Sequence, residues 1–182
     1  MRLPFLRAPG RNEPLILAMT GARLGERIVY CGRSAARLIP LAARAGLSGR
    51  VVLLGAGDTA ATLEQAAHRE GVLVEAVEQL PPDGAGGFDL AVLDVPHGSL
   101  EASGRRSAID QLVAALRPGG RLVAIEPGTR RGLGARFLGG APLPETDLVP
   151  LLETAGLRRP RVVGDQEGLR FVEALRAAQP EG

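Results

Sequence analysis

The sequence predicts a three-layer α/β sandwich, in which a seven-stranded, mostly parallel sheet lies between helices and ends in an antiparallel hairpin. Short runs rich in Val, Leu and Ile alternate with longer Ala-rich stretches of helical spacing, which is the pattern of strands joined by crossover helices. The runs are almost continuously apolar, as expected for strands covered on both faces. Only four residues separate the last two runs, too few for a crossover helix, so these two strands must pair antiparallel.

Seven runs have the strand pattern and four stretches have the helix pattern. The predicted strands are Arg27–Gly32, Arg50–Gly55, Val72–Val77, Phe88–Asp94, Gly120–Pro127, Arg161–Gly164 and Leu169–Leu175. The predicted helices are Ser34–Ala45, Thr59–Glu70, Arg105–Leu116 and Thr146–Ala155. Proline and glycine between these elements predict a loop over 81–87 and a sharp turn over 117–120.

Length and composition indicate one globular domain. The 182 residues are enough for a single domain with its own core and too few for two. Aromatic residues make up only 3% of the chain, so the core must consist of Leu, Val and Ala. All 22 basic residues are arginine, which together with abundant Ala, Gly and Pro indicates a GC-rich bacterial genome. We therefore divide the chain into an N-terminal segment, 1–23, expected to act as a lid, and one domain, 24–182.

Charge and cysteine content exclude several classes of protein. The formal net charge of +2 is spread along the chain and does not form the basic surface of a nucleic-acid-binding protein. One cysteine, Cys31, and two histidines exclude an internal disulfide and a Cys/His metal site. No apolar run reaches the roughly 20 residues of a transmembrane helix, and Met1–Gly10 does not read as a signal peptide. We expect a cytoplasmic protein that acts on a small molecule or binds a protein partner.

The segment Leu116–Pro127 contains the clearest motif. It reads LRPGGRLVAIEP and closely resembles the L-x-P-G-G turn before the fifth strand of class I S-adenosylmethionine-dependent methyltransferases, especially those of ubiquinone and menaquinone biosynthesis. Phe88–Asp94 resembles the F-D-x-V strand of that family, and Leu151–Leu157 resembles its last helix. The resemblance covers about residues 24–176 and implies a Rossmann-like fold with S-adenosylmethionine as the cofactor.

Two segments compete for the loop that would hold the cofactor. Val51–Ala60 is a strand followed by G-x-G-x-x-A and a helix, the pattern of a nicotinamide- or flavin-binding loop. Gly25–Ala36 instead fits the methyltransferase pattern G-x-x-V-L-D-x-G-x-G-x-G from its first glycine. The number of strands favours the second assignment. If Val51–Ala60 held the cofactor loop, Arg27–Gly32 would be an extra strand ahead of the first strand of the fold. A dinucleotide-binding protein remains an alternative.

The resemblance implies contacts to the cofactor from the turn after the first strand, with several departures from the family pattern. Gly32 keeps the first loop glycine, whereas Ser34 and Ala36 replace the second and third. Arg33 adds bulk and positive charge to the same turn. Tyr30 stands where the first strand of the family has an acidic residue. The turn is therefore expected to hold the cofactor less firmly than its relatives do.

The resemblance also assigns contacts to the second, third and fourth strands. Asp58, next to Gly57, is the acid available for the ribose hydroxyls, although it fits the N-cap of the following helix equally well. Ala76 falls at the acid that contacts adenine, and Glu75 flanks it. Glu75 and Asp94 are expected to end their strands at the edge where such sheets bind ligands.

One residue on the acceptor side is a candidate for a catalytic role. His97 follows the fourth strand, where the family binds the methyl acceptor. Histidine is a common general base because an unperturbed imidazole has a pKa near 6.5. Methyl transfer is an in-line displacement, so positioning under a lid from the N-terminal segment and Gly128–Pro144 matters more than acid–base chemistry. Two functions stay open besides the dinucleotide-binding alternative: a methyltransferase for a small molecule, and a pseudoenzyme that has lost the cofactor and serves as an interaction or structural subunit.

Overall fold

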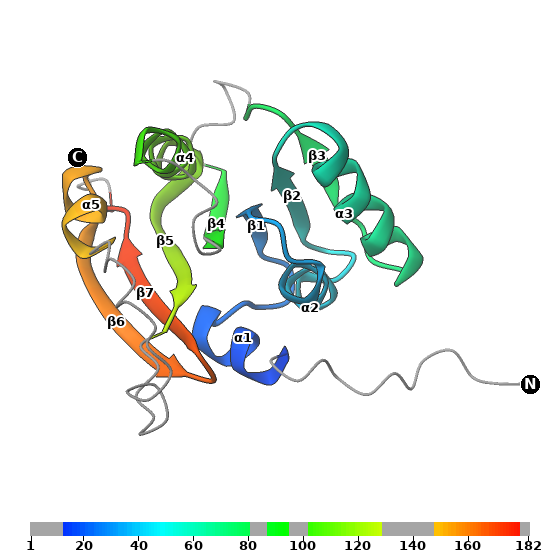
Figure 1. Ribbon diagram of the computed structural model, residues 1–182, viewed down its shortest axis with the longest axis horizontal. Coiled ribbons are helices and arrows are strands. Elements are labelled where there is room, and N and C mark those ends of the chain that lie inside the picture. The colour runs from blue at the N-terminus through cyan, green and yellow to red at the C-terminus, as the bar shows by residue number, and fades with distance from the viewer. Residues whose placement is uncertain (1–12, 81–86, 95–101, 129–147, 179–182) are drawn as a thin grey trace, which may run out of the picture.

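The strands of the protein form one seven-stranded sheet (Figure 1). The computed structural model describes residues 13–80, 87–94, 102–128 and 148–178. Along the sheet the strand order is β3-β2-β1-β4-β5-β7-β6. The strands are β1 (Arg27–Cys31), β2 (Arg50–Leu54), β3 (Glu75–Val77), β4 (Phe88–Asp94), β5 (Leu116–Pro127), β6 (Arg158–Gln166) and β7 (Leu169–Leu175).

Strand directions confirm the predicted sheet. Strand β7 pairs antiparallel with both β5 and β6, and every other pair of neighbours is parallel. The C-terminal hairpin follows from the short connection between β6 and β7, which turns with positive φ at Glu167 and Gly168. Strand β1 lies between β2 and β4, as the methyltransferase assignment of the strands requires.

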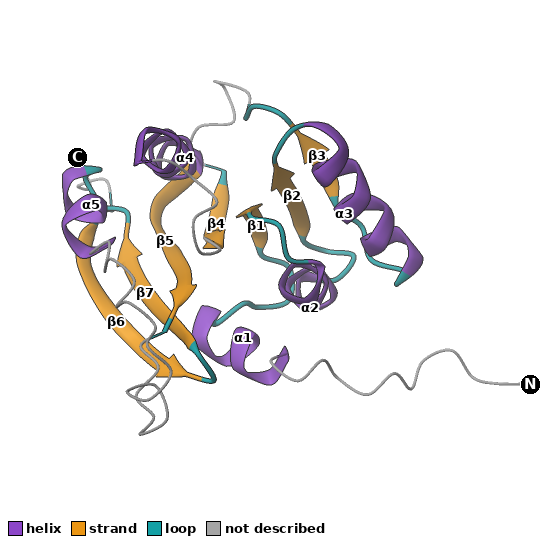
Figure 2. Cartoon of the chain, viewed as in Figure 1, coloured by secondary structure: helices purple, strands orange, loops and turns teal. Residues whose placement is uncertain are grey.

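Helices cover both faces of the sheet (Figure 2). Alternate side chains of β1 enter different cores: Ile28 and Tyr30 pack on one face, and Val29 packs on the other. Residues of α1, α2 and α3 complete the first core, and residues of α4 and α5 complete the second. The helices are α1 (Glu13–Thr20), α2 (Ala35–Ala45), α3 (Gly57–Arg69), α4 (Ala102–Ala115) and α5 (Leu148–Thr154).

The order of the strands fixes where a ligand can bind. From β1 the chain continues to β2 and β3 on one side, and it then returns to β4 on the other side of β1. In open α/β sheets, ligands bind outside the carboxyl ends of the strands at the point where the order reverses. That point lies between β1 and β4, beside the turn that begins at Gly32.

The L-R-P-G-G segment forms a bulge within β5 where the sequence predicted a sharp turn ahead of the strand. Leu116 already pairs with Phe88, and pairing resumes two residues along β4, between Leu90 and Arg121. The intervening residues contact the chain just after β7, where the amide of Gly119 donates to the carbonyl of Arg176 at 3.2 Å. Gly119 has φ +76°, a conformation that glycine adopts at little cost.

Part of the predicted N-terminal lid is a helix that packs on the domain. Ile16 of α1 is fully buried in the first core. Arg121 at the start of the regular part of β5 holds the end of this helix. Its Nε donates to the carbonyl of Thr20 at 3.1 Å, and its Nη2 donates to the carbonyl of Gly21 at 2.7 Å. The same guanidinium pairs with Glu26 at 2.9 Å.

Replacing Arg121 with alanine is expected to lower the free energy of unfolding by about 2 kcal/mol, because it leaves the Glu26 carboxylate without its positive partner and two carbonyls without their donor. Urea unfolding measures the loss, and amide exchange should accelerate first in α1. Arg161→Ala, which breaks an exposed pair with Glu173, is the control and should change the free energy by less than about 1 kcal/mol. Equal losses in both variants would contradict a clamping role for Arg121.

Candidate functional site

Three segments meet at the carboxyl edge of the sheet. The turn after β1 runs from Gly32 to Ser34, which is the N-cap of α2. Asp94 ends β4 directly beside it, since Cys31 pairs with Leu93. The turn after β2 leads through Gly55 into α3. The structure therefore brings together the predicted residues of β1 and β4, which are 64 positions apart in the sequence.

A buried network joins Tyr30, Asp94 and Arg37 across the switch point. Tyr30 and Asp94 are almost completely buried. The Tyr30 hydroxyl donates to Oδ2 of Asp94 at 2.5 Å, and the guanidinium of Arg37 forms a salt bridge with Oδ1 of the same carboxylate. The amide of Ser34 donates to the Tyr30 hydroxyl oxygen at 3.3 Å. The network thus ties the turn after β1 to the end of β4.

Burial sets the protonation of this network. Desolvation raises the pKa of Asp94 above its ordinary value, although the Tyr30 hydroxyl and the Arg37 charge act in the opposite direction. Desolvation, and then the Asp94 carboxylate, raise the pKa of Tyr30 well above that of a free phenol. Tyr30 therefore keeps its proton at neutral pH and remains a hydrogen-bond donor to Asp94.

Gly32 is required by the packing of this network. A Cβ atom at this position would lie 2.6 Å from Cβ of Asp94 and 2.8 Å from the Tyr30 hydroxyl oxygen. Neither neighbour is the end of a flexible chain, so a side chain at 32 would push the two residues apart. The one loop glycine that survives from the family pattern therefore has a structural reason in addition to any contact with a ligand.

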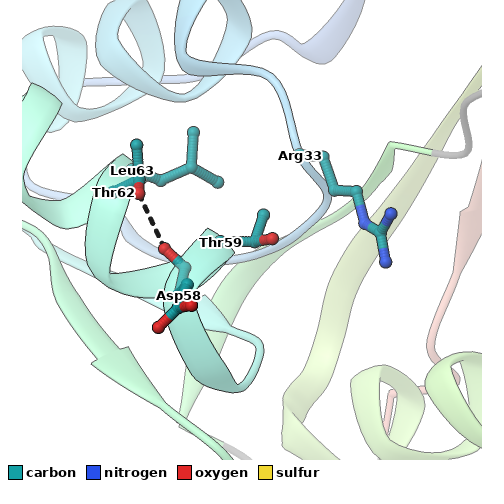
Figure 3. Close-up of a pocket in the computed structure, with 5 residues that line it drawn as sticks. All are labelled: Arg33, Asp58, Thr59, Thr62 and Leu63. Carbon is teal, nitrogen blue, oxygen red and sulfur yellow. Dashed lines mark hydrogen bonds between the residues drawn. The ribbon is translucent and has the colours of Figure 1, made fainter.

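A cavity of about 260 Å³ lies beside the turn, between Arg33 and the first turns of α3 (Figure 3). Thr59, Thr62 and Leu63 line it together with Arg33 and Asp58. The Thr62 hydroxyl donates to the backbone carbonyl of Asp58 at 2.7 Å and not to its carboxylate. Figure 3 shows the Arg33 side chain extending away from the α3 residues. The volume is below the lower end of ligand pockets, about 300 Å³, and the cavity is a hollow open to solvent.

Asp58 does not cap α3, so the N-cap interpretation is wrong. Helix α3 begins at Gly57, two residues before the predicted start, and Ala56 occupies the N-cap without any side-chain hydrogen bond. Asp58 is the second helical residue and is exposed. A carboxylate in the first turn still favours the helix dipole. The described residues show no hydrogen bond to this carboxylate, and it is available to a ligand.

Glu75 begins β3 and does not end it, in contrast to the prediction. It pairs with Arg50 at 2.7 Å, on the side of the sheet away from the switch point. The reason is that residues 72–74 form a connection after α3, where the amide of Val72 donates to the carbonyl of Ala67. Ala76 donates its amide to Oε1 of Glu64 at 3.1 Å, so an α3 side chain already occupies this position.

Arg37 is a member of the site that the sequence analysis missed. It lies in the first turn of α2, where the helix dipole disfavours a positive charge. An arginine three residues after the N-cap Ser34 therefore suggests that a nearby acid balances its positive charge.

His97 falls outside the described residues, as does the predicted lid from 129 to 144. Gly57, with φ +68°, opens α3 beside the cavity. Among the described residues, no group of three or more His, Cys, Asp or Glu side chains is arranged to hold a metal ion.

The thiol of Cys31 is expected to be unreactive. Burial, with a smaller contribution from Asp94, raises its pKa to about 11. The thiolate fraction at pH 8 should therefore be about two orders of magnitude below that of a free cysteine. Iodoacetamide labelling followed by mass spectrometry should be slow in the native protein and fast in guanidinium chloride. Equal rates in the two conditions would contradict the partly buried position of Cys31.

Comparison with known proteins gives structural matches only. No family model matches the sequence, and no curated protein matches it either. A SAM-dependent methyltransferase from Aquifex aeolicus superimposes with a TM-score of 0.67 at 21% identity, over 92% of this chain and 93% of that one. A putative O-methyltransferase from Nostoc punctiforme gives 0.68 at 12% identity, over 90% of this chain and 56% of that one. The [4+2]-cyclase SpnF gives 0.64 at 18% identity, over 93% and 81%. The protein has the fold of the class I SAM-dependent methyltransferases.

Proposed function

We propose that the protein binds S-adenosylmethionine at the turn after β1 and transfers its methyl group to a small-molecule acceptor. The observation that carries the proposal is the position of β1 at the switch point, with the Gly32–Ser34 turn and the cavity beside Asp58 at its carboxyl end. The structural similarity to SAM-dependent methyltransferases supports it. The switch point lies between β1 and β4, whereas the loop over 55–60 follows β2, on the other side of β1. This favours the methyltransferase assignment, in which the turn after β1 holds the cofactor and Asp58 of the neighbouring loop contributes from the side.

The residues around the cavity fit the parts of this cofactor. The Asp58 carboxylate is placed to accept hydrogen bonds from the ribose hydroxyls, and Leu63 offers an apolar surface to the adenine. Arg37 keeps a partly exposed guanidinium beside the switch point, where it can bind the amino-acid carboxylate. The cofactor, when bound, supplies an electrophilic methyl group. The chain itself orients the two reactants and excludes water, which is what an in-line displacement needs.

A pseudoenzyme is the second candidate, and the Tyr30–Asp94–Arg37 network favours it. Asp94 is the acid that β4 presents to the switch point, and both of its oxygens already have partners within the chain. A carboxylate whose two oxygens are already engaged is a poor general base for deprotonating a methyl acceptor. In addition, one structural neighbour is a [4+2]-cyclase by name, so the fold alone does not specify methyl transfer.

Titration calorimetry with S-adenosylmethionine and S-adenosylhomocysteine tests the proposal. We expect binding to the wild-type protein and a loss on the order of tenfold to a hundredfold in Asp58→Asn, because the charged acceptor for two hydroxyls is removed. Asp110→Asn, at an exposed acid on α4 that pairs with Arg106, should bind normally. Absence of binding at millimolar concentrations would overturn the cofactor assignment. Binding without turnover across a panel of phenols, amines and thiols would favour the pseudoenzyme.

A further inference from the structure

The most exposed large hydrophobic side chains of the described residues lie together at one edge of the sheet. Leu24 is 75% exposed, Leu47 is 92% exposed and Leu73 is 71% exposed. Each lies in the connection that precedes one of the strands β1, β2 and β3. These strands are adjacent and parallel, so the three leucines share the amino edge, opposite to the candidate site.

Strand pairing places Leu24 next to the connection that carries Leu47, and Leu73 on the same edge one strand further on. Arg27 pairs with Arg50, and Leu24 and Leu47 each lie three residues before these positions. A Cβ on Gly46 would meet Cδ1 of Leu24 at 2.8 Å, so the Leu24 side chain lies against the connection that carries Leu47. Neighbouring strands are about 4.8 Å apart. Leu73, ahead of the next strand, therefore extends the same surface, which we call the leucine edge (Leu24, Leu47 and Leu73).

Each leucine of the leucine edge has an exposed arginine within four residues of it in the sequence. Arg23 precedes Leu24, and Arg44 and Arg69 lie in the last turns of α2 and α3 beside the other two leucines. All three arginines are exposed, and the salt bridges of the described residues include none to them.

Several acids lie near the leucine edge, and two of them form ion pairs with arginines outside it. Glu26 pairs with Arg121 at 2.9 Å, and Glu75 pairs with Arg50 at 2.7 Å. Glu70 is an exposed acid on the third connection. With three arginines against this one acid, the edge combines protruding leucines with a surplus of positive charge.

We propose that the leucine edge docks on the surface of an anionic lipid bilayer. Leucines of this exposure insert among the lipid headgroups, and arginines beside them contact lipid phosphates while their stems remain on the apolar side. A second copy of the chain fits less well. Three leucines supply far less than the roughly 800 Å² per partner of a standard interface, and a two-fold axis through the patch would bring arginines against arginines. Docking in this way leaves the carboxyl edge, with the candidate site, facing water.

Vesicle co-sedimentation of the full chain tests the proposal. The wild-type protein should sediment with vesicles of phosphatidylcholine and phosphatidylglycerol at low ionic strength, and it should remain in solution with phosphatidylcholine alone. L24S/L47S/L73S should lower the partition coefficient on the order of tenfold or more, since the insertion of three leucines is lost. R23Q/R44Q/R69Q should lower it by a similar factor and remove most of its salt dependence.

Matched variants elsewhere on the surface serve as controls. Val162→Ser removes an exposed apolar side chain of β6, and Arg161→Gln removes an exposed arginine of the same strand. Both should bind vesicles like the wild type, and all variants should keep the thermal midpoint because the residues are exposed. No association with anionic vesicles, or unchanged association of L24S/L47S/L73S, would overturn the proposal. So would a dimer in sedimentation equilibrium that Leu47→Ser dissociates, because it would assign the leucine edge to self-association.

Discussion

Replacing Asp94 with alanine is expected to lower the free energy of unfolding by about 3–5 kcal/mol, the cost of removing one partner from a buried charged pair. The carboxylate accepts the Tyr30 hydroxyl and pairs with Arg37, so its loss leaves a buried phenol and a guanidinium without their shared partner. Urea unfolding monitored by circular dichroism measures the change. Asp110→Ala, which removes an exposed carboxylate on α4, should cost less than about 1 kcal/mol.

The pH dependence of this effect has an unusual sign. Because burial raises the pKa of Asp94 in the folded state, the native protein binds more protons at this group than the unfolded chain does. The stabilising contribution is therefore fully present below the ordinary carboxyl pKa, and it is lost as the pH rises through the raised value. Asp94→Asn, which cannot titrate, is the reference. The free energy of unfolding of the wild type relative to Asp94→Asn should fall between acidic and neutral pH; a rise over the same interval would contradict the assigned desolvation.

Glycine-to-alanine substitutions in the two competing loops should have very different effects. Gly32→Ala places a Cβ 2.6 Å from Asp94 and 2.8 Å from the Tyr30 hydroxyl, and overpacking of this kind costs about 1–3 kcal/mol. Displacement of the turn should also weaken S-adenosylhomocysteine binding on the order of tenfold or more, because misplaced groups lose hydrogen bonds to the ligand.

Gly55→Ala is the matched control in the loop after β2. The added Cβ would lie 3.6 Å from Cβ of Ala60, an ordinary contact, and the backbone at Gly55 does not have positive φ. This variant should unfold and bind like the wild type in the same urea and calorimetry experiments. A loss of affinity in Gly55→Ala together with normal binding in Gly32→Ala would transfer the ligand to the loop over 55–60.

The sequence was sufficient for the architecture because the architecture depends on patterns within single segments. The apolar run over 27–32 and the short connection at 165–168 predicted a central strand and a terminal hairpin, and both were found. Boundaries were less predictable. Residues 72–74 carry strand-forming side chains, yet they form a connection because the amide of Val72 bonds to the end of α3. As a result, Glu75 starts β3 and lies away from the ligand edge.

The candidate site was harder to predict because its members come from distant parts of the chain. Tyr30 stands where the family has an acidic residue, so the sequence predicts that this position lacks a carboxylate. In the fold, Asp94 of β4 brings a carboxylate to the Tyr30 hydroxyl. Nothing in a single segment shows that pairing, and Arg37 was missed for the same reason. Of the two roles considered for Asp58, the N-cap is wrong because α3 begins at Gly57, and the contact with the ribose stays a prediction.

A crystal structure with S-adenosylhomocysteine tests the central claim most directly. We predict ligand density against the turn from Gly32 to Ser34, with the ribose hydroxyls within hydrogen-bonding distance of the Asp58 carboxylate. Density that contacts only the loop over 55–60 and leaves the turn after β1 bare would contradict the cofactor assignment.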